Sequence, residues 1–507
     1  MQTIPEIVDY FNDNKTYIKA ENRPVFTFAD LKKQIISTKI FFQNHQVKKN
    51  DTVAIILQNG PEMASSFIAT ASNCCAAPLN PNYTSSEFSF FLNDLKPKAL
   101  IVEKGSNSPV IEIASNNNIK IFWLDFDNSD PAGKFNIESA DKDKNKPIDK
   151  YEDILPEDNA LILHTSGTTS KPKMVPLSHL NLCTSAKNIV QTLSLNRNDS
   201  CINVMPLFHI HGIACLLLAS LYSGGSIFTS PGFNALKFFM WVKVFSPTWY
   251  SAVPAMHQAI MSRANKNIDI IKNNKFRFIR SSSAPLSTTT MKEIEQAFNC
   301  PVIESYGMTE ASHQMTSNHL PPGKRKSSKV GFAAGPSVSI MDKHNKILNI
   351  GKTGEIVIKG KNVTTGYINN SKANKESFIK GWFRTGDEGF FDDEGFLKIT
   401  GRIKEIINKG GEKISPLEID DAIMKHKSVF QVVSFSIPHK KLGEDIASAV
   451  VLKENHNLTE KEIKLFLGDK LATFKIPKKI VFLQEIPKGN TGKLQRIGLA
   501  KTLGLDK

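Results

Sequence analysis

The chain has 507 residues, 40% of them hydrophobic and 22% charged, so it is long enough for at least two domains with large cores. It carries 64 lysines and arginines against 49 aspartates and glutamates, a net charge of +15. Such an excess suits nucleic acid, an anionic membrane or a polyanionic small molecule. The basic residues are scattered along the chain rather than gathered in one arm or stripe, which disfavours a nucleic-acid binder. The composition therefore indicates a globular enzyme.

The cysteines and the two ends of the chain bear on the expected compartment. The six cysteines show no C-x-x-C pair and no regular framework, so we expect reduced core residues of an intracellular protein. The N-terminus lacks the pattern of a secretory signal, and the last residues are not a peroxisomal S-K-L address. The longest apolar run, around residues 213–218, is too short to span a bilayer. The cytosol is therefore the expected location.

Helix-like and strand-like segments alternate over the first hundred residues. The apolar spacing predicts helices over 28–42 and 62–71, and a β-branched run predicts a buried parallel strand over 52–57. This alternation predicts a doubly wound α/β layer. Residues 126–158 are rich in Asp, Lys and Asn, and we expect them to form an exposed, irregular connection.

A loop rich in hydroxyl groups follows the apolar residues 161–163. Its members are Thr165, Ser166, Gly167, Thr168, Thr169, Ser170, Lys171, Pro172 and Lys173. Main-chain N–H groups of such a loop can form a nest for phosphate oxygens, and the lysines add positive charge. Composition alone also allows a merely solvated Ser/Thr loop. It is not a Walker loop, because no Gly-Lys-Ser/Thr follows at the required spacing.

An H-x-H pair follows the helix predicted over residues 178–193. His209 and His211 could bind a metal, but no third ligand lies nearby at a useful spacing, so an ordinary core or loop position is favoured. Further on, a strand is predicted over 276–280. The helix after it is expected to begin at the capping box formed by Thr290 and Glu293.

A second polar segment, residues 304–310, follows a short apolar run. In open α/β sheets, ligands bind at the carboxyl ends of the strands. An aromatic ring there could stack on a base (Tyr306), a hydroxyl could donate to phosphate (Thr309), and a carboxylate could hold Mg²⁺ (Glu310). Taken alone, the Y-G-x-T-E pattern is weak evidence, and the loop at 165–173 strengthens it.

From residue 331 the pattern becomes rich in strands. Asp387 stands in a glycine-flanked turn, where it could cap the turn or, if buried, bind two ribose hydroxyls. The glycines and charges of residues 401–411 suit a hinge. Behind them, capping boxes beginning at Ser415 and Thr459 predict two helices of a compact α+β domain.

Five segments, in order, resemble the motifs of the adenylate-forming superfamily of acyl-CoA synthetases, peptide-synthetase adenylation domains and beetle luciferases. They are residues 165–173, 306–310, 381–387, 401–411 and 487–496. The resemblance implies a large N-terminal domain, residues 1–400, with two doubly wound α/β subdomains and a β-rich subdomain. A hinge at 401–404 and a small mobile α+β domain at 405–507 follow. The implied reaction joins a carboxylate to ATP as an acyl-adenylate, and CoA then displaces AMP.

The resemblance also implies which residues hold the triphosphate. The loop at 165–173 would hold the β- and γ-phosphates, Thr309 would touch the α-phosphate, and Glu310 would hold Mg²⁺. Ser170 and Met174 depart from the family pattern, since glycine is frequent at both positions. A side chain at Met174 restricts the backbone, which leaves the loop geometry open.

The nucleoside contacts are implied in the same way. Tyr306 would stack on adenine, with Glu304 and Ser305 beside it. Asp387 and Arg402 would hold the ribose.

The mobile parts of the reaction are implied to lie near the C-terminus. Lys493 would bridge the carboxylate and the α-phosphate during adenylation, and Lys404 would be the hinge residue. Rotation there would bring the backbone of Gly410 and Gly411 against CoA. His209 would line the wall between the acyl pocket and the CoA tunnel.

The acyl pocket is implied to be polar, because His211, Ser283 and His313 fall on its wall. These groups suit a second carboxylate on a very small acid, unless the histidines face elsewhere. Within the superfamily, the segments around them resemble oxalate–CoA ligases of fungi and plants, which are often peroxisomal in fungi. A medium-chain fatty acid or a 4-coumarate-like aromatic acid is the alternative substrate. A monomer and a homodimer are both left open.

Overall fold

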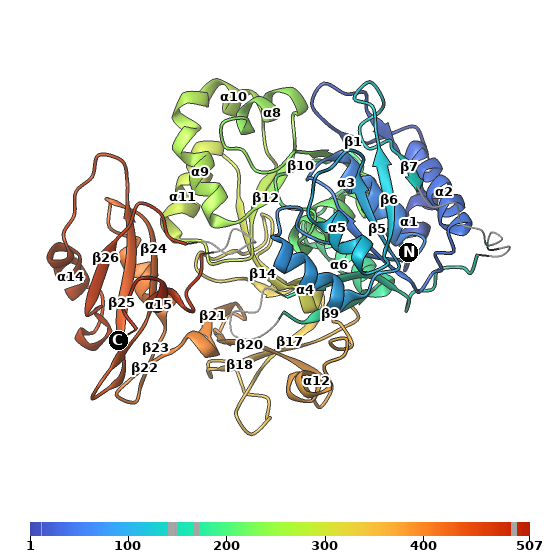
Figure 1. The fold of residues 1–507 in the computed structure, drawn as a ribbon. Helices are drawn as coiled ribbons and strands as arrows, with labels where there is room; N and C mark the ends of the chain where they lie inside the picture. The colour runs from blue at the N-terminus through green and yellow to red at the C-terminus, as the bar shows by residue number, and fades with distance from the viewer. Residues whose placement is uncertain (12, 140–147, 149–150, 166–171, 488–493, 507) are drawn as a thin grey trace.

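The computed structural model describes residues 1–507 except 12, 140–147, 149–150, 166–171, 488–493 and 507. The middle of the phosphate loop and the predicted catalytic Lys493 therefore lie outside the described residues. In Figure 1 the C-terminal sheet and its helices form a separate body at the left, joined to the rest near β21 (Leu397–Arg402). Within the described ranges, no helix combines the length and the apolar character needed to cross a bilayer.

The first large sheet is a parallel sheet with an antiparallel strand at each edge, in the order β7-β6-β5-β3-β4-β8-β9. Its strands are β3 (Thr52–Ile56), β4 (Cys75–Pro78), β5 (Ala99–Glu103), β6 (Lys120–Asp125), β7 (Asn136–Ser139), β8 (Asn159–His164) and β9 (Met174–Ser178). The helices in this part of the chain are α1 (Ile4–Tyr10), α2 (Phe28–Asn44), α3 (Pro61–Ala71), α4 (Ser85–Leu95) and α5 (Val110–Asn116).

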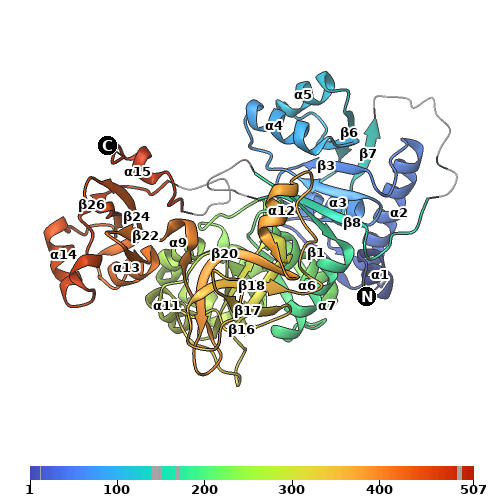
Figure 2. The same ribbon diagram turned by 90° about the horizontal axis from the view of Figure 1, so that it is seen from below.

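Strand β3 shows why this sheet is doubly wound. Successive side chains of a strand point to opposite faces, and all residues from Val53 to Ile56 are buried. Val53 and Ile55 join the core that contains α2 and α3 residues, whereas Ala54 and Ile56 join the core that contains α4 and α5 residues. Figure 2 shows these two helix pairs on opposite sides of the sheet.

The second large sheet has the order β16-β15-β14-β13-β12-β10-β11-β1-β2 and is parallel from β14 to β1. Its strands are β1 (Thr16–Lys19), β2 (Phe26–Thr27), β10 (Ser200–Asn203), β11 (Ser226–Thr229), β12 (Trp249–Ala252), β13 (Phe278–Ser281), β14 (Val302–Met308), β15 (His313–Ser317) and β16 (Phe332–Ala333). The helices of this part are α6 (His179–Thr192), the π-helix η1 (His211–Leu218), α7 (Ala219–Ser223), α8 (Phe238–Phe245), α9 (Pro254–Ala264), η2 (Asn265–Asn267), α10 (Ile268–Asn273), α11 (Thr288–Phe298) and η3 (Thr309–Ala311).

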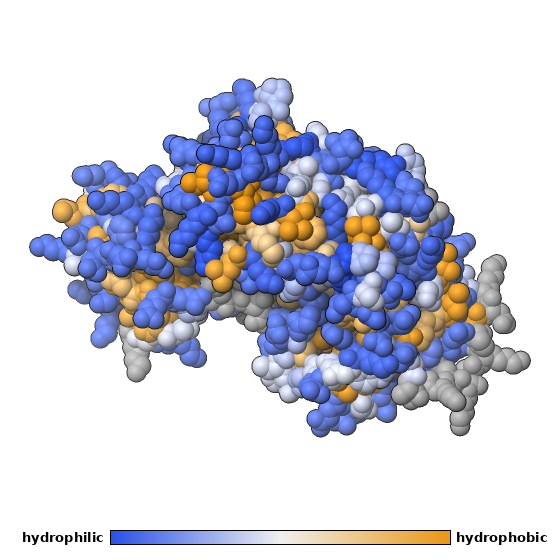
Figure 3. Space-filling view, turned by 90° about the horizontal axis from the view of Figure 1, so that it is seen from above, coloured by the Kyte–Doolittle hydropathy of each residue, from blue (hydrophilic) through white to orange (hydrophobic). Residues whose placement is uncertain are grey.

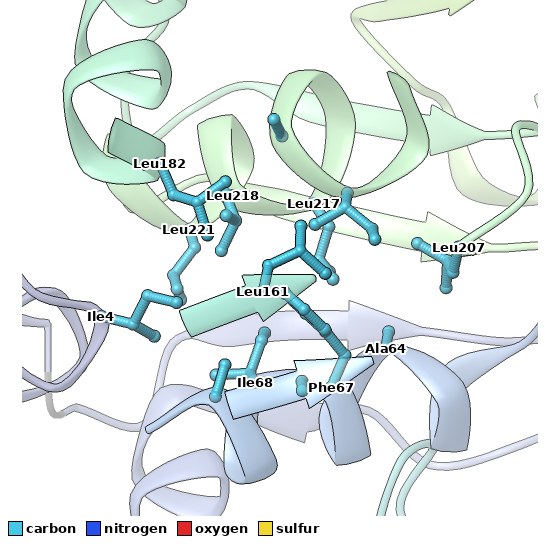
Figure 4. Packing of buried hydrophobic residues seen from close by; sticks show 14 of the residues in the cluster. Ile4, Ala64, Phe67, Ile68, Leu161, Leu182, Leu207, Leu217, Leu218 and Leu221 are labelled. Carbon is cyan, nitrogen blue, oxygen red and sulfur yellow. The ribbon is translucent and has the colours of Figure 1, made fainter. Parts of the chain in front are cut away.

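The two large sheets share one hydrophobic core, which fixes the strand that leads into the phosphate loop. Figure 4 shows Leu161 of β8 between side chains of α3, among them Phe67 and Ile68, and leucines of the second layer such as Leu217. Leu161 is fully buried. Burial of this strand from both sides anchors Thr165, which follows it.

Two smaller sheets complete the chain. An antiparallel sheet contains β17 (Ser337–Met341), β18 (Gly354–Lys359), β19 (Phe378–Ile379), β20 (Trp382–Phe391) and β21 (Leu397–Arg402), beside α12 (Ser371–Ser377). The C-terminal body contains η4 (Ile403–Glu405), β22 (Ile407–Lys409), β23 (Glu412–Ile414), α13 (Pro416–Ile423), β24 (Val429–His439), β25 (Gly443–Leu452), α14 (Glu460–Gly468), η5 (Thr473–Lys475), β26 (Lys479–Phe482) and α15 (Leu499–Thr502). The predicted fold class, mixed α/β with a larger N-terminal and a smaller C-terminal part, is confirmed.

Three local predictions were wrong. Helix α11 begins earlier than Thr290, because the Ser287 side chain accepts from the Thr290 N–H and caps the helix. Asp387 lies within strand β20 rather than in a turn. The connection expected over 126–158 is partly structured, since β7 pairs with β6 and Phe135 is buried.

The outer surface and the cysteines agree with the composition. The face seen in Figure 3, which carries α8 and α10, is mostly hydrophilic, with small groups of hydrophobic residues between. All six cysteines are buried and free, as predicted.

Candidate active site

The base of the phosphate loop is closed by the β8–β9 pair. The Thr165 N–H donates to the Lys173 carbonyl at 2.9 Å, and the Lys173 N–H donates to Thr165 Oγ1 at 3.2 Å. These bonds set where the loop leaves and re-enters the sheet. Lys173 Nζ lies 4.6 Å from the centre of the Tyr367 ring, a cation–π contact. A lysine ammonium is thereby held beside the loop, whose residues 166–171 lie outside the described chain.

Glu310 contacts the hydroxyl group of the same tyrosine. The Tyr367 hydroxyl donates to Glu310 Oε1 at 2.9 Å, and Glu310 is buried. Burial raises the pKa of this carboxyl, while the charges of Arg402 and Lys173 act in the opposite direction. The carboxylate lies next to Thr309, in the short helix η3. Its position suits a bound cation, which would relieve the cost of burying the charge.

Tyr306, Asp387 and Arg402 form one connected group. The Tyr306 hydroxyl donates to Asp387 Oδ2, and Arg402 Nε donates to Asp387 Oδ1 at 2.8 Å. Asp387 and Arg402 stand directly opposite each other on β20 and β21, so the sheet register aligns them. Burial and the nearby Asp387 raise the pKa of Tyr306, and Asp387 raises that of Arg402. Three of the five predicted nucleoside contacts therefore meet at one place.

Glu304 and Ser305 lie on the same strand, β14. Glu304 Oε1 accepts from the Leu286 N–H at 3.1 Å, while Oε2 has no hydrogen-bond partner among the described residues. Burial raises the pKa of Glu304 to about 8, so this carboxyl is protonated at neutral pH. Ser305 Oγ donates to the Ser281 carbonyl at 3.4 Å. Glu304 thus presents a protonated group with hydrogen-bonding capacity to spare.

The three residues predicted for the acyl pocket are brought together from distant parts of the chain. His211 Nδ1 lies 3.1 Å from Ser283 Oγ, and the rings of His211 and His313 have centroids 4.8 Å apart. Ser283 and His313 both have positive φ, +73° and +94°. Such conformations cost energy in non-glycine residues and gather at functional sites.

Two glycines of the sequence motifs allow this packing. A side chain at Gly307 would put its Cβ 1.8 Å from the His313 carbonyl oxygen, and one at Gly212 would put it 2.2 Å from the Pro206 carbonyl. Any other residue would force these backbones apart. His209, which is half-buried, precedes the π-helix, and its Nδ1 accepts from the His211 N–H at 3.3 Å. A π-helix is rare and often marks a functional position.

Sequence reasoning missed two buried residues beside this pocket, Cys215 and Arg280. Cys215 is one helical turn after His211, and Arg280 lies on β13. Arg280 Nη1 donates to Cys215 Sγ at 3.2 Å, and Arg280 is 0% exposed. Within the described ranges, no carboxylate lies within 4.0 Å of this guanidinium. Only the presence of an arginine directly after the apolar pair Phe278 and Ile279 of a predicted strand could have drawn attention to Arg280.

This cluster contradicts the prediction that no further metal ligand lies near His211. His211 does have further candidate ligands, because atoms of His211, Cys215 and His313 all lie within 4.8 Å of one another. However, Cys215 Sγ already accepts from a cation, and burial raises the pKa of its thiol, whereas metal binding needs the thiolate. A divalent cation would also lie beside the Arg280 charge. The pocket therefore favours an anion.

The hinge and the predicted CoA contact lie at the start of the C-terminal body. Lys404 is in η4, between β21 and β22. Gly410 and Gly411, with φ of +62° and +96°, form the two-residue turn between β22 and β23. Positive φ at both positions is what the favoured hairpin turn requires.

Arg496 ties the hinge to the C-terminal body. Its Nε donates to Glu405 Oε2 at 3.1 Å and its Nη2 to Asp420 Oδ2 at 2.8 Å. The Arg496 side chain is 12% exposed, and the residue follows the segment 488–493 in the sequence. Glu405, the residue after the predicted hinge, is therefore linked through Arg496 to helix α13.

Comparison with known proteins identifies the class. The family model for AMP-binding enzymes matches residues 10–368, and that for the AMP-binding enzyme C-terminal domain matches residues 418–493. The chain belongs to the AMP-binding enzyme family.

Individual proteins of known activity or structure are similar to this chain. The chain is 42% identical to an oxalate–CoA ligase of Saccharomyces cerevisiae, over 97% of this chain and 95% of that protein. It is 43% identical to an oxalate–CoA ligase of Arabidopsis thaliana, over 89% and 88% of the two chains. The crystal structure of ATP-bound MatB from Rhodopseudomonas palustris matches with a TM-score of 0.87 and 27% identity, over 99% of this chain and 98% of that one.

Proposed function

We propose that this protein is an ATP-dependent acid–thiol ligase that joins oxalate to CoA. It would form oxalyl-adenylate and diphosphate, and CoA would then displace AMP to give the thioester. Relatives 42% and 43% identical over most of the chain are oxalate–CoA ligases. The family match and the residues gathered around Asp387 support the adenylation step.

The charge of the acyl pocket is the observation that carries the choice of acid. A pocket for fatty or aromatic acids should be lined by apolar side chains. Here two histidine rings and Ser283 meet beside a buried arginine that has no carboxylate partner among the described residues. These groups can donate hydrogen bonds to a second carboxylate and balance its charge. The smallest dicarboxylate, oxalate, fits this chemistry.

The nucleotide contacts are proposed residue by residue. Tyr306, with Glu304 and Ser305, would contact adenine; Asp387 and Arg402 would hold the ribose, displacing part of the Tyr306–Asp387 contact. Thr309 would contact the α-phosphate, and the loop at 165–173 the β- and γ-phosphates. Glu310 fits Mg²⁺, because it is a buried hard-oxygen ligand beside the phosphate site, and Mg²⁺ commonly takes one carboxylate and the substrate phosphates. The ion would supply charge neutralisation of the triphosphate.

We also propose a role for each domain and for the hinge between them. Residues 1–400 would form the ATP- and acid-binding domain, 401–404 the hinge around Lys404, and 405–507 the mobile domain. Lys493 would act during adenylation, and Gly410 and Gly411 would face CoA afterwards, with His209 on the wall between the two sites. Cytosol is the proposed compartment, and the peroxisomal matrix is the alternative from family resemblance.

Diphosphate release in the presence of ATP, Mg²⁺ and CoA tests the proposal. Oxalate should support turnover, and hexanoate and 4-coumarate should be poorer by about 100-fold or more in kcat/KM, because neither brings a second carboxylate to the buried charge. Equal turnover of hexanoate or 4-coumarate would show a fatty or aromatic acid ligase instead. No turnover with any acid, together with salt-sensitive DNA binding, would point to a nucleic-acid binder.

A further inference from the structure

The buried arginine beside the acyl pocket has an unusual set of partners. Besides Cys215 Sγ, Arg280 donates from Nη2 to Gln314 Oε1 at 3.2 Å and from Nη1 to Ser251 Oγ at 3.4 Å. The orientation of the Gln314 amide is fixed, since its Nε2 donates to Thr192 Oγ1 at 3.1 Å and to the Ala334 carbonyl at 2.9 Å. Its oxygen must therefore face the guanidinium, and Arg280 is held from that side.

Ser251 connects this arginine to the pocket. Ser251 and Arg280 are direct neighbours on the parallel strands β12 and β13. Ser251 Oγ also lies 2.7 Å from His211 Nε2, and the opposite ring nitrogen, Nδ1, lies 3.1 Å from Ser283 Oγ. A continuous chain of polar contacts thus runs from the guanidinium through Ser251 and His211 to Ser283.

The donors available in this chain fix its direction. Arginine can only donate, so Ser251 Oγ accepts from Arg280. Ser251 has one hydroxyl hydrogen, and the imidazole nitrogen at 2.7 Å is a much better acceptor than the Cys215 sulfur. Ser251 therefore donates to His211 Nε2, which must be unprotonated. A neutral imidazole then carries its hydrogen on Nδ1 and donates to Ser283 Oγ.

We infer that Ser251 and Arg280 are positioning residues that hold His211 as its Nδ1–H tautomer and thereby turn the Ser283 hydroxyl hydrogen toward the bound acid. This inference rests on the proposed function for the identity of the acid. Each group donates a hydrogen bond to the next one, so the chain ends at the Ser283 hydroxyl, whose hydrogen needs an acceptor. A carboxylate offers only acceptors, so this chain suits an acid whose far end is a second carboxylate.

The tautomer can be measured without any substrate. Enzyme labelled with ¹⁵N in histidine gives distinct long-range ¹H–¹⁵N correlation patterns for the two neutral tautomers, and the His211→Gln variant identifies the signals of His211. The wild type should show the Nδ1–H pattern. In Ser251→Ala the ring loses the donor at Nε2, so the Nε2–H form should appear.

Kinetics on the same variants give the second readout. Ser251→Ala should raise KM for oxalate about tenfold, the worth of roughly one hydrogen bond, with a smaller change in kcat. Arg280→Met should act in the same direction, and Arg280→Lys should recover part of the loss. Ser281→Ala is the matched control, because Ser281 is equally buried, adjoins Arg280, and its Oγ has no partner among the described residues. If Arg280→Met fails to fold, Ser251→Ala decides, since it leaves the buried charge in place.

Two results would overturn the inference. One is an Nε2–H pattern for His211 in the wild type, with Ser251 donating to Cys215 instead. The other is a Ser251→Ala variant with an unchanged tautomer and an unchanged KM. The tautomer measurement uses no substrate, so a failure of the proposed function, seen as no oxalate turnover, stays distinguishable from a failure of this inference.

Discussion

The two halves of the candidate site treat charge in opposite ways. On the nucleotide side, charged groups meet partners of opposite sign or strong donors: Asp387 contacts Arg402 and Tyr306, and Glu310 contacts Tyr367. On the acyl side, Arg280 is buried with neutral partners and with no carboxylate among the described residues. An unbalanced buried cation is costly unless an anion joins it. The charged groups named on the nucleotide side are therefore paired within the protein, whereas we expect the charge on the acyl side to be balanced by the ligand.

The largest expected loss of activity is on the nucleotide side, and it should be the same whichever acid is the substrate. Glu310→Gln removes the charge proposed to hold Mg²⁺, so diphosphate release should fall by about 100-fold or more with any acid. The matched variant Tyr367→Phe keeps the carboxylate and loses only one hydrogen bond, so its loss should be about tenfold or less. A Glu310→Gln enzyme that keeps wild-type rates would remove Glu310 from the reaction.

The acyl side should show the reverse selectivity. His313→Ala and His211→Gln should each lower kcat/KM for oxalate by about 100-fold. The first removes a proposed donor to the second carboxylate, and the second removes the ring that orients the Ser283 hydroxyl. KM for ATP should change by no more than about threefold, since the nucleotide contacts lie on other residues. Steady-state kinetics with ATP and oxalate varied separately give both values. Equal losses for the two substrates would break the division between the sides.

A moderate effect is expected where the hinge joins the C-terminal body. Arg496→Met removes the contacts to Glu405 and Asp420, so adenylation and thioester formation should both fall about tenfold. Lys475→Met, which breaks the exposed pair with Glu418, is the control and should leave both half-reactions unchanged. Single-turnover assays of each half-reaction measure this. A loss confined to one half-reaction would mean that Arg496 does not act through the hinge.

The smallest effect concerns stability rather than turnover. Because the pKa of Glu304 is raised from 4.5 to about 8, the folded protein keeps a proton there that the unfolded chain releases. This contribution to stability is lost as the pH rises from 4.5 through about 8. Glu304→Gln keeps the neutral form at every pH. Thermal unfolding at about pH 6 and about pH 8.5 should show a smaller fall for the variant than for the wild type, and parallel curves would contradict the shift.

The sequence was informative wherever a pattern was local. The alternation of apolar runs predicted the doubly wound layers, and the capping box at Thr459 predicted the start of α14. Resemblance to the superfamily selected His211, Ser283 and His313, which the structure places together.

Other features depended on contacts between distant segments. Cys215 and Arg280 come together across 65 positions, and a π-helix sets the spacing from His211, so no local pattern pointed to them. The start of α11 depended on whether Ser287 or Thr290 supplied the cap, and Asp387 was taken for a turn residue because glycine precedes it. Register across β20 and β21, rather than local sequence, decided that position.

The comparison of oxalate with glyoxylate tests the central claim most directly. Both acids have two carbons, but glyoxylate lacks the second carboxylate that would complete the charge of the acyl side. Diphosphate release should favour oxalate by about 100-fold or more in kcat/KM, and Arg280→Met should shrink that ratio. Equal kcat/KM for the two acids, or a ratio that Arg280→Met leaves unchanged, would contradict the account.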